Sequence, residues 1–118
     1  MSKAPIPPRH LTDTAVRAWH RIFATAVARG IWRAEFRVSL ELTAVLCAAY
    51  IDGARALLSP DGPQGNDADR RELEEKRLLV RRLLVDYGVI APERERLAGI
   101  NEEGLDSDIE GVCALNPR

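Results

Sequence analysis

The sequence predicts an all-α protein built from three main helices and a short fourth. Apolar residues recur every three or four positions through residues 12–29, 33–58 and 69–87, which is the period of an amphipathic helix. No stretch of the sequence alternates apolar and polar residues for long enough to predict a strand. The chain has 118 residues, of which 46% are hydrophobic and 30% are charged, and this suits one domain with a single core.

The first predicted helix follows a proline-containing lead-in over residues 1–10. Thr12 is suited to cap its start and Gly30 is suited to end it. One side of this helix gathers the apolar side chains of Ala15, Trp19, Ile22, Phe23 and Ala26. The lead-in has no apolar signal core, and no apolar run of the sequence approaches the roughly 20 residues that cross a bilayer. We therefore expect a cytoplasmic protein that does not enter a membrane.

The second predicted helix is apolar on nearly all sides. One stripe holds Phe36, Leu40, Cys47, Tyr50, Ile51, Ala54 and Leu57, and a second apolar face holds Val38, Leu42, Val45, Leu46, Ala49 and Ala56. Such a helix must be covered nearly all round, which two other helices of a short chain cannot do. We therefore expect a homo-oligomer in which the neighbouring subunit covers Leu42, Val45, Leu46 and Ala49. Gly53 fits either a break in this helix or the close approach of another helix.

The remaining helices are shorter or more polar. The composition of residues 59–69 is that of a loop, and the third helix that follows it ends at Gly88. Pro92 then opens the short fourth helix, which reaches Leu97.

Residues 99–118 carry five acidic residues against one arginine and offer little to pack, so we expect a flexible tail. Its acidic side chains belong to Glu102, Glu103, Asp106, Asp108 and Glu110. The expected organisation is therefore a flexible lead-in over residues 1–10, a helical core and oligomerisation domain over residues 11–98, and this acidic tail.

The sequence contains no set of residues that predicts an enzyme. The glycine-bearing loop at residues 62–65 lacks the Lys and the Ser or Thr of a phosphate-binding loop. His10 and His20 stand ten residues apart without paired cysteines, which does not fit a zinc site. Cys47 and Cys113 are expected to be buried thiols in a reducing compartment. We therefore expect no catalytic residue, no cofactor and no metal.

The basic residues concentrate near the N-terminus, because residues 1–40 carry seven Lys or Arg residues against two Asp or Glu. Arginine suits phosphate because its planar guanidinium can donate two hydrogen bonds at once. The candidate contacts with double-stranded DNA are Arg9, Arg17, Arg21, Arg33 and Arg37. The alternative is that these arginines only keep the helix surfaces solvated.

Four short motifs follow one another in a fixed order. They are Pro8-x-x-Leu11-x-x-x-Ala15-x-x-x-Trp19-x-x-Ile22 in the first helix, Leu46-Cys47-x-x-Tyr50 in the second, Leu83-Leu84-x-x-Tyr87-Gly88 at the end of the third, and Pro92 before an arginine-rich turn. Over residues 7–98 the chain thereby resembles the bacteriophage terminase small subunit, the non-catalytic half of the DNA-packaging machine of tailed phages.

The resemblance implies a ring-forming helical subunit that binds double-stranded DNA in the host bacterial cytoplasm. The ring would deliver this DNA to the large terminase subunit, an ATPase and nuclease, for packaging into phage-like capsids, and the acidic tail would bind that large subunit. A gene transfer agent, which packages host DNA, would use a similar protein. Two other classes stay open: a structural helical head-completion or connector protein, and a small DNA-binding regulator.

Overall fold

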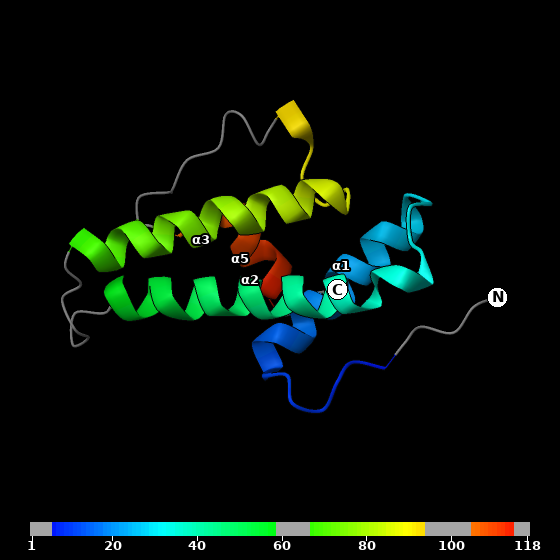
Figure 1. The fold of residues 1–118 in the computed structure, drawn as a ribbon, viewed down its shortest axis with the longest axis horizontal. Helices are drawn as coiled ribbons and strands as arrows, with labels where there is room; N and C mark the ends of the chain where they lie inside the picture. Colours follow the sequence, from blue (N-terminus) through cyan, green and yellow to red (C-terminus); the bar gives the residue numbers. More distant parts are fainter. Residues whose placement is uncertain (1–5, 59–66, 94–104, 115–118) are drawn as a thin grey trace.

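The computed structural model describes residues 6–58, 67–93 and 105–114 (Figure 1). Its elements are α1 (Asp13–Ala28), the short 3₁₀ helix η1 (Ala34–Phe36), α2 (Arg37–Leu58), α3 (Asp67–Asp86) and α5 (Ser107–Cys113). The described ranges contain no strand. The predicted all-α class, with three main helices and a short further one, is therefore confirmed.

Two of the predicted boundaries fall partly outside the described residues. Pro92 and Glu93 are helical, as expected of a fourth helix, while residues 94–97 are not described. Likewise, residues 59–66 of the predicted loop are not described, and α3 begins at Asp67, two residues earlier than its sequence pattern suggested. Within the described part, no helix is long and apolar enough to cross a membrane.

Glycine ends both α1 and α3 in the same way. Gly30 and Gly88 have φ values of 73° and 79°, in the left-handed region that side chains with a Cβ rarely adopt. After α1, the N–H of Ile31 donates to the carbonyl of Ala26 at 3.0 Å, which satisfies a carbonyl that the helix itself leaves open. At the start of α1, the Thr12 hydroxyl accepts from the Ala15 N–H at 3.2 Å. The predicted caps of α1 are therefore confirmed.

Helix α2 supplies much of the hydrophobic core. Figure 1 shows α3 running alongside α2, while α1 crosses α2 at a steep angle. The core side chains of α2 are Leu40, Ala44, Cys47, Tyr50, Ile51 and Ala54, and they meet Trp19 and Ile22 of α1 and Val80 and Leu84 of α3. Helix α2 continues through Gly53, where an added Cβ would lie only 3.2 Å from the Leu73 side chain of α3. Gly53 therefore allows close helix packing and does not break the helix.

A chain of five aromatic rings holds the turn between α1 and α2 against the end of α3. Neighbouring ring centroids lie 5.0–6.2 Å apart along the series Trp19, Phe23, Trp32, Phe36 and Tyr87. The Tyr87 hydroxyl also donates to the Phe36 carbonyl at 3.4 Å. These contacts hold η1 in place, and Arg33 and Arg37 flank it on either side.

The prediction of a flexible tail is wrong for residues 105–114. This segment forms α5, whose Ile109, Val112 and Cys113 are buried against α1 and α2. These apolar residues follow helical spacing, and their burial outweighs the acidic composition around them. The short helix is therefore part of the core and not a separate tail.

Candidate self-association and DNA-binding surfaces

One side of α2 stays uncovered. We define the α2 outer face as Val38, Leu42, Val45 and Ala49, whose spacings of four, three and four residues place them in one stripe along the helix. Val38 is 77% exposed, Leu42 57% and Val45 39%. Apolar side chains in a contiguous stripe gain free energy when a partner removes them from water. The stripe is therefore a candidate interface.

The sequence-predicted interface residues divide between two sides of α2. Leu42 and Val45 are exposed and Ala49 is half-buried, all on the outer face. Leu46, in contrast, is partly buried and packs against the core, so less of its side chain is available to a neighbouring subunit than in Leu42 or Val45. The sequence pattern grouped these residues because the two apolar faces of α2 adjoin. The boundary between the buried face and the exposed face depends on where the other helices pack.

A cavity of about 240 Å³ lies beside the α2 outer face. It is lined on the α1 side by His10, Leu11, Thr12 and Ala15, and on the α2 side by Val45, Ala48, Ala49 and Asp52. Most of these groups are apolar, and the two titratable ones are His10 and Asp52. His10 Nε2 also lies 2.9 Å from Glu41 Oε2, which brings the lead-in into contact with α2. The cavity is large enough to take an apolar side chain.

A second exposed apolar patch lies on α3. Leu78 is 52% exposed and its neighbour Leu79 is 47% exposed, and we call them the α3 leucine pair. They lie outside the apolar stripe by which α3 packs on α2, which includes Val80 and Leu84. The interface prediction from the sequence missed this patch. Two leucines out of register with the buried stripe were the signal that could have found it.

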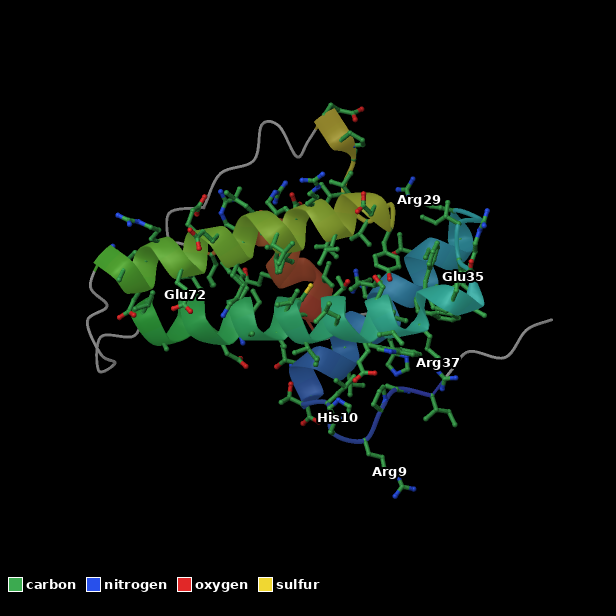
Figure 2. The ribbon with its side chains drawn as sticks, in the orientation of Figure 1. Arg9, His10, Arg29, Glu35, Arg37 and Glu72 are labelled. Atoms are coloured by element: carbon green, nitrogen blue, oxygen red, sulfur yellow. The ribbon has the colours of Figure 1, made fainter. Side chains whose placement is uncertain are left out.

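Three of the predicted DNA contacts remain at the surface. Arg9, Arg33 and Arg37 are exposed. Figure 2 shows Arg9, His10 and Arg37 on the same side of the molecule, and the contact of His10 with Glu41 places the lead-in beside the first turns of α2. These arginines are therefore placed where phosphate groups could reach them.

The other two predicted contacts are less available. The Nε of Arg17 donates to the carbonyl of Cys113 at 2.9 Å, and its Nη2 donates to the Thr14 hydroxyl at 3.4 Å. Arg17 thus binds a carbonyl at the C-terminal end of α5, which a cation stabilises. Arg21 is half-buried. Arg17 is thus less available to DNA than the exposed arginines, because α5 packs against this side of α1.

A buried cluster of charges anchors the start of α5. Asp106 and Arg81 are 1% and 2% exposed, and Arg81 Nη1 lies 2.6 Å from Asp106 Oδ2. Arg77 Nη1 meets the same oxygen at 3.1 Å, and the Tyr50 hydroxyl accepts from the Asp106 N–H at 3.2 Å. Asp106 Oδ1 in turn accepts from the N–H groups of Asp108 and Ile109, which caps α5.

This cluster also changes the ionisation of its neighbours. The hydrogen bond from Arg77 lowers the pKa of Glu74 below its ordinary value, while burial raises the pKa of Tyr50. Two nitrogens of Arg81, Nε and Nη2, have no hydrogen-bond partner among the described residues. Removal of Asp106 would therefore leave Glu74 beside Arg77 and Asp108 beside Arg81, and the buried positive charge would be less well neutralised.

Three of the acidic residues predicted to bind a partner lie in the described part of the chain, and each of them lies near an arginine. Asp106 is buried, Asp108 lies 3.1 Å from Arg81, and Glu110 lies 3.9 Å from Arg55. Glu102 and Glu103 are outside the described residues. For Asp106 the prediction of a free partner-binding side chain is wrong, because its charge is used to hold α5 on α3.

Within residues 6–58, 67–93 and 105–114, no group of three His, Cys, Asp or Glu side chains is arranged to hold a metal ion. The comparisons add no relative: the chain matches no known family model, no curated protein and no solved structure. The arguments about function therefore rest on the α2 outer face, the α3 leucine pair, the exposed arginines and the resemblance of the sequence motifs.

Proposed function

We propose that this protein is a non-catalytic DNA-packaging subunit that assembles with copies of itself. In this proposal it binds double-stranded DNA and delivers it to a large ATPase-nuclease subunit in the bacterial cytoplasm, as the resemblance to terminase small subunits implies. The observation that carries the proposal is the α2 outer face, an apolar stripe exposed on a helix whose opposite side is in the core. Self-association would remove that stripe from water.

Charge supports the DNA part of the proposal. Arg9, Arg33 and Arg37 are exposed, so one subunit offers only a few phosphate contacts. An assembly multiplies these contacts by its number of subunits, and simultaneous engagement raises the apparent affinity without any new kind of contact. Such binding releases counterions and should weaken steeply between about 50 and 200 mM salt.

The test combines the mass in solution with a salt titration of binding to duplex DNA. Light scattering on the wild-type protein should give a mass several times the 13.1 kDa of one chain. Replacing both Arg33 and Arg37 with alanine should reduce the slope of log affinity against log salt by about two for each subunit that contacts DNA. The oligomer should keep its mass.

A matched control removes two exposed arginines at the other end of the molecule. Arg55 and Arg70 lie near the end of α2 and the start of α3, and both are exposed. Their double alanine variant loses the same charge and should keep the wild-type slope. If the salt slope were the same in both variants, the DNA-binding surface would not include the η1 turn. An oligomer that does not bind DNA at all would favour a structural head-completion or connector protein.

A further inference from the structure

We infer that the α3 leucine pair of one copy docks onto the α2 outer face of the next copy, with Leu78 entering the cavity beside Val45. The inference rests on the proposed self-association and specifies its contact. The two surfaces suit each other, because Leu78 and Leu79 are exposed apolar side chains on α3, whereas a cavity of about 240 Å³ with mostly apolar lining lies beside the α2 outer face. A leucine side chain that enters this space loses part of its exposure to water.

Charge supports a contact between these two helices in opposite directions. On α2, Glu41 precedes Val45 by four residues and Asp52 follows it by seven. On α3 the order is reversed, because Arg82 follows Leu78 by four residues and Arg71 precedes it by seven. An antiparallel contact centred on Val45 and Leu78 therefore brings Glu41 to Arg82 and Asp52 to Arg71, since equal numbers of helical residues span equal lengths.

The side chains involved are available for such a contact. Asp52, Arg71 and Arg82 are exposed. Glu41 meets His10 through Oε2, and the carboxylate has a second oxygen that can accept from Arg82. Within each helix the three interacting positions lie within about 40° around the helix axis, at 100° per residue. Both stripes can therefore face a partner helix along their whole length.

The geometry of one subunit allows both contacts at once. Figure 1 shows α3 on one side of α2 and the first turns of α1, which line the cavity, on the other side. Each copy can therefore insert its α3 leucine pair into one neighbour and receive the leucine pair of another neighbour on its α2 outer face. A contact between unlike surfaces is head-to-tail, and it generates a closed ring when the rotation between neighbours closes.

The test uses two variants that block one surface each, Val45→Glu and Leu78→Glu. Both positions are exposed, so the fold should survive, as circular dichroism would verify. Each variant alone should fall to a single-chain mass of 13.1 kDa in light scattering at a concentration where the wild type is assembled. Mixed in equal amounts, they should form a complex of two chains and no larger one, because one intact contact remains possible between them.

A charge exchange provides a second measurement. Asp52→Arg alone and Arg71→Asp alone should each weaken assembly, and the two substitutions together should restore it. Val27→Glu is the matched control, because Val27 is an exposed apolar residue of α1 outside both surfaces, and this variant should keep the wild-type mass.

The outcomes separate this contact from the proposed function. A wild-type protein that is monomeric at micromolar concentration overturns both. An oligomer that survives Leu78→Glu but not Val45→Glu keeps self-association and overturns the head-to-tail contact in favour of α2 pairing with itself. Two monomeric variants that stay monomeric when mixed also overturn it.

Discussion

The charged residues at the two ends of the chain have opposite environments. In the acidic C-terminal segment, Asp106 is buried with two arginines around it, and its nearest ion pair measures 2.6 Å. In the basic N-terminal third, His10 meets Glu41 at 2.9 Å while its own side chain is 67% exposed. The two distances are nearly equal, so separation alone does not rank the pairs. What differs is their exposure to solvent. Water screens the charges of the exposed pair, whereas the buried groups of Asp106 and Arg81 have no water to replace a lost partner.

This comparison shows why charge composition is a poor guide to structural role in this protein. The strongly acidic segment supplies a buried anchor that holds α5 on α3 through Arg77 and Arg81. The strongly basic segment contributes both a structural hydrogen bond, from Arg17 to α5, and exposed side chains such as Arg33 and Arg37. Variants that remove one charged group at a time should separate these roles.

The largest effect is expected from Asp106→Ala. The substitution removes the carboxylate that Arg77 and Arg81 share, so that Arg77 keeps only Glu74 and Arg81 keeps only Asp108 among the acidic partners in the described part of the chain. It also removes the cap of α5, so the free energy of unfolding should fall by about 3 kcal/mol. Urea denaturation measures the change. Glu110→Ala is the matched control on the same helix, because Glu110 is part of an exposed pair at 3.9 Å, and it should cost less than about 0.5 kcal/mol.

Asp106→Asn separates the two roles of the residue. Asparagine keeps an oxygen that can cap α5 but removes the negative charge that faces Arg81. If the buried ion pair dominates, this variant should be nearly as unstable as the alanine variant. A stability close to that of the wild type would assign the effect to the cap alone.

An intermediate effect is expected from Arg17→Ala. The hydrogen bond from Arg17 Nε to the Cys113 carbonyl involves a charged donor, and its loss should lower the free energy of unfolding by about 1.5 kcal/mol. Hydrogen exchange should show the change concentrated in α5. Arg21→Ala, one turn further along α1, is the control and should leave α5 protected. Equal loss of protection in both variants would show that Arg17 does not hold α5.

The helices were predictable from the sequence because their signals are local. Thr12, Gly30 and Gly88 act within one turn of the backbone, and the apolar stripes of α1 and α2 repeat over several turns. The class of the fold follows from such patterns. The candidate surfaces follow only in part, because exposure depends on which helix covers which face. Leu46 and Leu42 look alike in the sequence, yet only Leu42 is left uncovered.

Helix α5 could not be predicted in the same way. Its apolar residues number only a few, and its key residue is an aspartate whose partners lie 25 and 29 positions earlier in the chain. A pairing over that distance leaves no periodic signal. Because the tail was expected to be flexible, the hydrogen bond from Arg17 to the end of α5 could not be foreseen either.

The smallest effect is expected from His10→Ala, although the contact of His10 with Glu41 is nearly as short as the buried ion pair of Asp106 with Arg81. Both partners are partly solvated, at 67% and 36% exposure, so the substitution should change the free energy of unfolding by less than about 1 kcal/mol. A double-mutant cycle with Glu41→Ala measures the coupling directly, and we expect a value near zero. A coupling of several kcal/mol would mean that the lead-in is anchored as firmly as α5, and that solvent exposure does not distinguish the two pairs.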